Sequence, residues 1–82
     1  MSDMQLDPQV VGQAIAKLRA SRGITQEALS GLSDIGRTHL SAIERGERKP
    51  TLETIYRIAN ALGVSMTVIV TAIEDELNNA QK

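Results

Sequence analysis

Residues 26–44 read QEALSGLSDIGRTHLSAIE, and this stretch decides the fold. It predicts two short helices separated by a tight break. Thr25 suits the cap of the first helix, because its hydroxyl can accept from a backbone N–H in the first turn. The pattern is interrupted at residues 33–36, and a second helix then runs from Arg37 to about Arg45.

The second of these helices has two different faces. Successive residues are about 100° apart around a helix, so Leu40 and Ile43 point to one side. The residues on the other side are small or polar and end in a cation: Thr38, Ser41, Ala42 and Arg45. Such a face fits the major groove of DNA, which is about 12 Å wide and admits one helix. Bulky apolar residues would have indicated a protein groove instead.

The flanking sequence predicts three more helices. Asp7 and Pro8 suit a helix start, and Gly23 suits its end. Further helices are expected from 52 to 62, with Leu52 inward, and from 66 to about 78. No run alternates cleanly, so no strand is expected. We therefore predict an all-α, compact five-helix bundle: one domain over residues 7–79, with flexible ends at 1–6 and 80–82.

Composition excludes several classes of protein. The chain has 82 residues, no Cys and one His, which argues against disulfides and metal sites. No phosphate loop or paired nucleophile and base is present, so neither an enzyme nor a cofactor is expected. No stretch reaches the roughly 18 apolar residues of a membrane span. We expect a cytoplasmic protein without a membrane partner.

Charge is distributed unevenly along the chain. The net charge of −1 argues mildly against a nucleic-acid partner. However, residues 13–50 carry seven bases and four acids, hence +3, whereas residues 1–12 and 51–82 each sum to −2. The positive segment contains the two short helices, so the near-neutral total does not exclude DNA.

The last helix predicts a dimer. Its apolar residues cover an arc of roughly 200°, about twice what a surface helix needs. One explanation is burial within a single subunit, but 82 residues offer little protein to bury it in. The favoured explanation is a twofold interface through four residues: Val68, Ile69, Ala72 and Ile73.

Three segments resemble one family of proteins. They are LRASRGITQEAL from Leu18, RTHLSAIERGERKPTLETI from Arg37, and IANALGVS from Ile58. Together they resemble the phage Cro/repressor-type (XRE) helix-turn-helix family over roughly residues 10–70, and RTHLSAIERGERKPT is most similar to controller proteins of restriction–modification systems. The resemblance implies a phage-repressor type of five-helix DNA-binding fold that binds operators as a dimer.

The resemblance also implies roles for individual residues. The implied base-contacting positions lie on the second motif helix: Arg37, Thr38, Ser41 and Ala42. The implied phosphate-contacting positions are Gln26, His39, Arg45, Arg48 and Lys49. For each of these, ordinary surface exposure or a structural role is the alternative. Arg37 is the preferred base reader, since Arg can bond guanine O6 and N7 together.

An arginine and two glutamates have other implied roles. The family places a partly buried ion pair at the positions of Arg19 and Glu44. Structural pairing is therefore favoured over DNA contact for both. In related activators an acidic residue at the position of Glu27 touches RNA polymerase. The favoured alternative is that Glu27 stabilises the helix N-terminus.

The chain departs from the family pattern around the turn. Asp34 stands where Gly is usual, but Asp tolerates the left-handed conformation. Gly36 replaces a Ser or Thr cap and weakens the helix start. Ser33 replaces a small apolar residue, while Leu32 is unusually apolar, which we interpret as local repacking.

These observations predict a sequence-specific transcriptional regulator that binds a pseudo-palindromic operator as a homodimer. The favoured subtype is a restriction–modification controller that regulates its own gene and an endonuclease gene. A phage-type repressor and an antitoxin-type regulator are the nearest alternatives. From a different class, a protein-interaction or dimerisation module that does not bind DNA also stays open.

Overall fold

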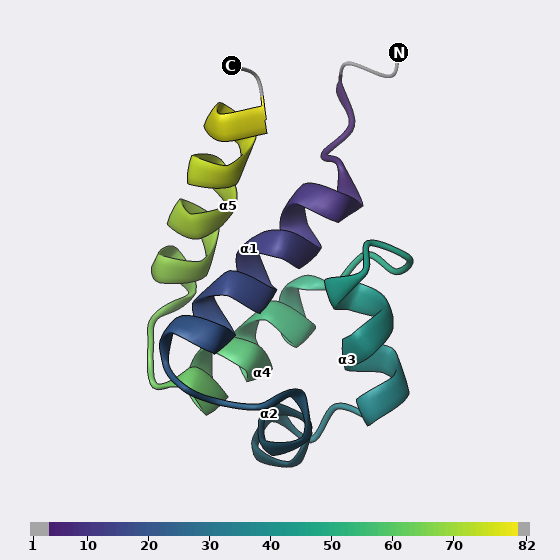
Figure 1. The fold of residues 1–82 in the computed structure, drawn as a ribbon, viewed down its shortest axis with the longest axis vertical. Coiled ribbons are helices and arrows are strands. Elements are labelled where there is room, and N and C mark those ends of the chain that lie inside the picture. The colour runs from purple at the N-terminus through teal and green to yellow at the C-terminus, as the bar shows by residue number, and fades with distance from the viewer. Residues whose placement is uncertain (1–3, 81–82) are drawn as a thin grey trace.

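Five helices make up the computed structural model, which describes residues 4–80 (Figure 1). They are α1 (Pro8–Ser21), α2 (Gln26–Ser33), α3 (Arg37–Glu44), α4 (Leu52–Leu62) and α5 (Met66–Ala80). No strand occurs in the described residues. The predicted all-α five-helix architecture is therefore confirmed. Of the expected flexible ends, residues 1–3 and 81–82 lie outside the described residues, while Ala80 belongs to α5.

Side-chain caps explain where three helices begin. The Asp7 carboxylate accepts from the Gln9 backbone N–H at 2.9 Å. The Thr25 hydroxyl accepts from the N–H of Ala28 at 3.1 Å and the Thr51 hydroxyl from that of Thr54, also at 3.1 Å. Each bond satisfies a donor that has no partner within its own helix. The starts of α1, α2 and α4 are thus determined by short-range chemistry.

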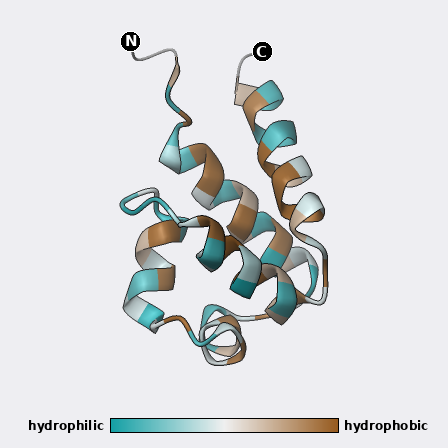
Figure 2. Cartoon of the chain, turned by 180° about the vertical axis from the view of Figure 1, so that it is seen from behind, coloured by the Kyte–Doolittle hydropathy of each residue, from teal (hydrophilic) through white to brown (hydrophobic). Residues whose placement is uncertain are grey.

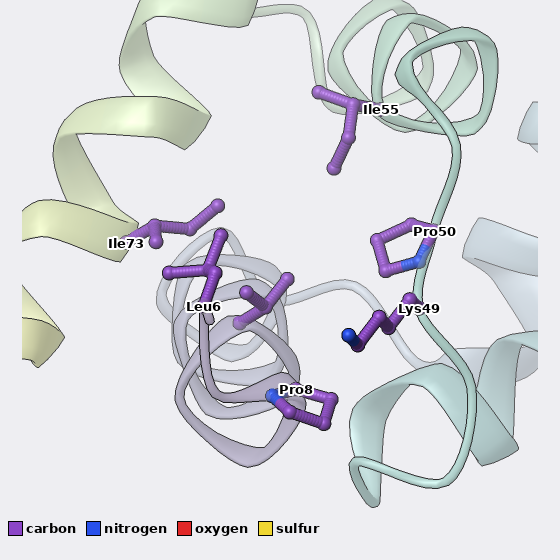
Figure 3. A pocket seen from close by; sticks show the side chains of 7 residues that line it. Leu6, Pro8, Lys49, Pro50, Ile55 and Ile73 are labelled. Carbon is purple, nitrogen blue, oxygen red and sulfur yellow. The ribbon is translucent and has the colours of Figure 1, made fainter. Parts of the chain in front are cut away.

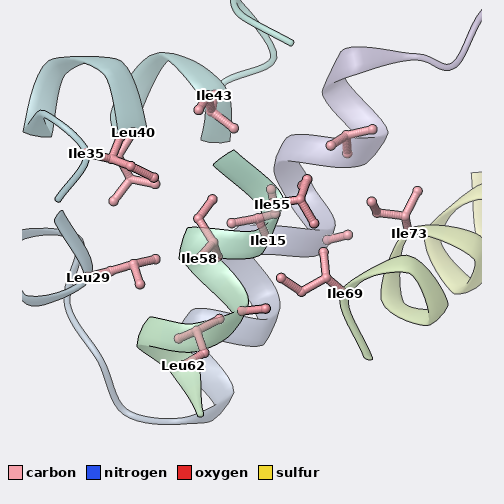
Figure 4. Close-up of a cluster of buried hydrophobic side chains, with 13 residues drawn as sticks. Ile15, Leu29, Ile35, Leu40, Ile43, Ile55, Ile58, Leu62, Ile69 and Ile73 are labelled. Carbon is pink, nitrogen blue, oxygen red and sulfur yellow. The ribbon is translucent and has the colours of Figure 1, made fainter. Parts of the chain in front are cut away.

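The core draws on every helix (Figure 4). Six large side chains are fully buried: Ile15, Leu29, Leu40, Ile43, Ile58 and Ile69. They come one each from α1, α2, α4 and α5, and two from α3. Burial of each contributes about 1.5–3 kcal/mol. Two of the eight residues of α3 lie in the centre of the core, so this short helix is firmly anchored.

Four apolar residues do not lie where the sequence placed them. Leu32 and Leu52 are exposed, so Leu52 does not point inward and Leu32 is not repacked into the core. Ile69 and Ile73, expected at a subunit interface, are buried in the core of their own subunit at 0% and 8% exposure. That interface loses both side chains because α5 packs against α1 and α4 within the subunit.

Two glycines let α1 lie against the end of α3. A Cβ on Gly12 would come within 2.3 Å of the Ile43 carbonyl oxygen and 2.6 Å of that of Glu44. Gly46, just beyond α3, has φ +81°, and its Cβ would lie 2.8 Å from the Cα of Gln9. The backbones therefore touch without intervening side chains, which fixes the position of α3 relative to α1.

Helices α4 and α5 are joined by a sharp bend. Within residues 4–80 no single helix is long and apolar enough to cross a membrane. Among the described residues, α4 and α5 taken together are long and apolar enough to span a membrane, but they are bent by 106° at the break between them.

Candidate nucleic-acid interface

Hydrogen bonds lie on both sides of the turn between α2 and α3. Asp34 adopts the left-handed conformation, with φ 57° and ψ 39°, as its place in the turn predicts. The buried Ser33 donates its hydroxyl proton to the Leu29 carbonyl at 2.6 Å. Arg57 of α4 donates to the Asp34 carbonyl at 3.3 Å. The Ser33 bond lies within α2, and the Arg57 bond joins the turn to α4.

The outward face of α3 is small and polar. Leu40 and Ile43 have no exposed surface, whereas Thr38 is exposed and Ser41 and Ala42 are half-buried. Gly36 caps the helix without a side-chain hydrogen bond, as its replacement of Ser or Thr predicts. The exposed Arg37 follows it in the first turn. The structure thus brings together the four residues expected to contact bases.

One partly buried arginine connects three segments of the motif. Arg19 of α1 donates from Nε to Glu44 Oε2 at 2.7 Å and from Nη2 to Oε1 at 3.0 Å. Its Nη1 donates to the Ile24 carbonyl at 2.8 Å. These bonds to Glu44 raise the pKa of the guanidinium above its ordinary value. The side chains of Arg19 and Glu44 are 17% and 5% exposed, so this pair is part of the scaffold.

Gln26 belongs to the same network. Its Nε2 donates to Glu44 Oε1 at 2.9 Å. The sequence placed Gln26 at a phosphate, and in the structure the donor group of its amide is directed at a carboxylate. A phosphate contact would therefore use the second proton of the amide or require the side chain to turn.

Arg45 and Ser41 are bonded to each other at the end of α3. Arg45 Nη1 donates to the Ser41 hydroxyl oxygen. Nε and Nη2 donate to the two Glu47 carboxylate oxygens, each at 2.9 Å. This raises the pKa of Arg45 and lowers the pKa of Glu47. Sequence reasoning missed Glu47, although the glycine between two opposite charges in Arg45-Gly46-Glu47 signals a turn that can pair them.

The other residues expected to contact DNA, the base reader Arg37 and the phosphate-contacting His39, Arg48 and Lys49, are exposed. Among residues 4–80, Arg37, Arg48 and Lys49 take part in no ion pair. The α3–α4 loop, which carries Arg48 and Lys49, is hydrophilic (Figure 2). His39 lies beside the turn and lines a polar hollow with Asp34 and Arg57.

Lys49 also borders an apolar pocket. The pocket has a volume of about 200 Å³ and lies between the start of α1, the α3–α4 loop, α4 and α5. Lys49 and Pro50 lie next to each other on one side of the pocket, and Leu6 and Ile73 lie on the opposite side (Figure 3). Lys49 as a whole is exposed.

Glu27 is exposed in the first turn of α2. There its negative charge favours the helix dipole. No ion pair involves Glu27 among the described residues.

Known proteins share both the sequence and the fold. The sequence pattern of the helix-turn-helix family matches residues 15–69. An uncharacterised HTH-type transcriptional regulator, y4dJ of Sinorhizobium fredii, is 42% identical over 66 residues, covering 80% of this chain and 86% of the relative. Control protein C.BamHI of Bacillus amyloliquefaciens is 43% identical over 54 residues, covering 65% of this chain and 67% of the relative.

A solved structure agrees closely with the fold. The wild-type restriction–modification controller protein C.Esp1396I superimposes with a TM-score of 0.80 at 33% identity, covering 89% of this chain and 96% of the other. Sequence pattern, relatives and architecture thus agree on the same motif at the same place in the chain. The chain belongs to the XRE-type helix-turn-helix family of DNA-binding transcriptional regulators, close to restriction–modification controller proteins.

Proposed function

We propose that the protein binds a pseudo-palindromic operator as a homodimer, with α3 of each subunit in the major groove. The observation that carries this proposal is the division of α3: Leu40 and Ile43 are fully buried, while Thr38, Ser41 and Ala42 form a small outward face. Two such helices would enter successive major grooves about 34 Å apart. Arg37 would read a base, and the exposed Arg48 and Lys49 would contact phosphates that position the dimer.

The proposal also gives roles to five other residues. Ser41 and Ala42 let the helix approach the base edges closely. Arg45 and His39 lie at the edges of the outward face, where backbone phosphates pass, and Gln26 lies at the start of α2. The protein would act in the cytoplasm without any cofactor.

A regulator of restriction–modification genes is the favoured subtype. The similarity to control protein C.BamHI and to controller protein C.Esp1396I supports it. The protein would then regulate its own gene and an endonuclease gene. A methyltransferase or endonuclease gene beside its own gene would support this subtype. A phage-type repressor and an antitoxin-type regulator are the alternatives, and the first has support from an immunity repressor of Bacillus phage phi105, 38% identical over 69 residues.

The dimer would use the exposed apolar residues of α4 and α5. Leu52 and Tyr56, one turn apart on α4, are 73% and 54% exposed, and Val70 of α5 is 47% exposed. Val68 and Ala72 lie on the opposite flank of α5, about 160° from Val70. Ala72 lines a hollow with Leu18 of α1. We place the interface on the flank with Val70, because Val70 is more exposed than Val68, at 47% against 40%.

Selection from random DNA tests the central proposal. Duplexes that the wild type retains should share a sequence with twofold symmetry. Arg37→Ala should lose about 1–3 kcal/mol of discrimination at one base pair per half-site. Arg48→Ala should instead weaken binding to every duplex. It should also reduce the slope of log affinity against log salt concentration by about 0.9 per subunit. A wild type that retains no duplex at low salt would favour the dimerisation-module alternative.

A contact of Glu27 with RNA polymerase is a separate proposal. Its support is the exposure of Glu27 in the first turn of α2. Glu27→Gln should leave operator affinity unchanged and reduce activated transcription in a purified system. Equal transcription by both proteins would leave only the helix-stabilising role.

A further inference from the structure

An acidic residue lies where the proposed interface needs positive charge. The Glu47 carboxylate accepts two parallel hydrogen bonds from Arg45, through Nε and Nη2, each at 2.9 Å. An arginine binds a phosphate group through the same forked pair of donors. Glu47 therefore occupies the donors that a DNA phosphate would use.

The third nitrogen of the guanidinium is engaged as well. Arg45 Nη1 donates to the hydroxyl of Ser41, on the outward face of α3. The guanidinium is thus bonded to Ser41 on one side and to Glu47 on the other. Both charged side chains are more than half exposed, at 54% and 60%, so a phosphate can reach the pair from solvent.

We propose that Glu47 is an internal substitute for a DNA phosphate: it holds Arg45 in a closed pair, and DNA must displace the carboxylate to bind Arg45. This inference rests on the proposed DNA-binding function. Phosphates carry no sequence information, so the closed pair lowers affinity for operator and unrelated DNA alike. Glu47 is therefore a positioning residue that acts through Arg45.

Direct repulsion between Glu47 and DNA is the competing explanation. Repulsion would lower affinity whether or not Arg45 is present. Displacement from a closed pair requires Arg45. A double-mutant cycle on the two residues separates these causes, because only the second predicts coupling between them.

The experiment measures affinity for two duplexes of equal length: one that the wild type selects from random DNA, and one unrelated to it. Glu47→Gln should tighten binding to both by about two- to fivefold per subunit, the range expected for an exposed ion pair. Glu76→Gln is the matched control. It removes the same charge from an ion pair with Lys17, at 2.7 Å between α1 and α5, and should change affinity much less.

Removing Arg45 completes the test. In an Arg45→Gln background, Glu47→Gln should no longer tighten binding. Arg45→Gln should reduce the affinity for DNA more in the Glu47→Gln variant than in the wild type. Arg45→Gln should also reduce the slope of log affinity against log salt concentration by about 0.9 per subunit, which a purely structural role would not do.

Two results would overturn the inference while leaving the proposed function intact. Glu47→Gln with wild-type affinity for both duplexes is the first, and equal tightening with and without Arg45 is the second. A wild type that selects no duplex from random DNA would instead remove the DNA-binding function itself, and the inference with it.

Discussion

Arg19 holds the motif together through a single guanidinium. It reaches the end of α3 through Glu44 and the α1–α2 connection through the Ile24 carbonyl. Because both charged groups are largely buried, the loss of one leaves the other without compensation. Arg19 thus controls stability, although it carries the type of charge that usually contacts DNA.

Replacement of Arg19 should be costly. Arg19→Met leaves the Glu44 carboxylate buried and unpaired, and we expect a loss of about 3 kcal/mol in the free energy of unfolding. Lys17→Met is the matched control. Lys17 is 67% exposed in its pair with Glu76, so its loss should cost less than about 1 kcal/mol. Urea denaturation measures both, and equal costs would contradict a scaffold role for Arg19.

Titration of Glu47 reports on the ion pair independently of DNA. Because the Arg45 guanidinium stabilises the charged form, the pKa of Glu47 lies below its usual range. The pair is therefore complete at neutral pH and is lost as the pH falls through this lowered pKa. Carboxyl-carbon NMR should show the pKa rise to an ordinary glutamate value in Arg45→Gln. An unchanged pKa in that variant would mean that the pair is not formed in solution.

At the scale of elements, the contact of α1 with α3 is unusually close. Gly12→Ala would place a methyl group against two α3 carbonyl oxygens, at 2.3 and 2.6 Å, and neither can move without the helix. We expect a loss of about 1–3 kcal/mol, as for other overpacked sites. Gly31→Ala on α2 is the control, since a Cβ added at Gly31 has no atom within 4 Å.

The two alanine variants should change stability in opposite directions. Gly31→Ala should stabilise the protein by up to about 1 kcal/mol through helix propensity. Thermal unfolding distinguishes them, and a rise in Tm for both would mean that α1 and α3 separate without cost. Operator affinity should fall only in Gly12→Ala, because that substitution moves α3.

Helix boundaries were predictable because their causes are local. Asp7, Thr25 and Thr51 cap backbone groups two or three residues away, and such pairs can be identified from sequence alone. The direction of an apolar side chain depends instead on which helices pack nearby. Periodicity gave the width of the apolar arc of α5, but not that α1 and α4 cover Ile69 and Ile73.

The candidate site was predictable to a different extent. The outward face of α3 follows from helix geometry, which places Thr38 about 160° from Leu40 and Ser41 about 160° from Ile43. The bond between Arg45 and Glu47 does not, since residues two apart do not meet on a helix. They meet because α3 ends at Glu44 and the chain turns at Gly46.

For the whole molecule, pairing explains how a chain of net charge −1 can present a basic surface. The acid of the buried pair, Glu44, contributes little to the outer surface, because its side chain is 5% exposed. Arg37, Arg48 and Lys49 are exposed and take part in no ion pair within residues 4–80. With three such cations per subunit, a dimer would double the number of phosphates that can be neutralised.

The subunit interface provides the whole-molecule test. Wild-type protein should sediment as a dimer at micromolar concentration. Val70→Glu should shift it to monomer, because a charge would be buried in the proposed interface. Val68→Glu, on the opposite flank of α5, is the matched control and should stay dimeric. The reverse pattern would place the interface on the flank of Val68 and Ala72, and a monomeric wild type would contradict the dimer.

The separation of α3 into two faces also has an evolutionary consequence. Substitutions at positions 37, 38, 41 and 42 leave the two fully buried side chains of this helix, Leu40 and Ile43, in place. A duplicated gene could therefore acquire a new binding preference in a few substitutions while it keeps a folded product at every step. Divergent copies on this scaffold could coexist in one cell and avoid cross-talk, because the residues that discriminate are not those that fold.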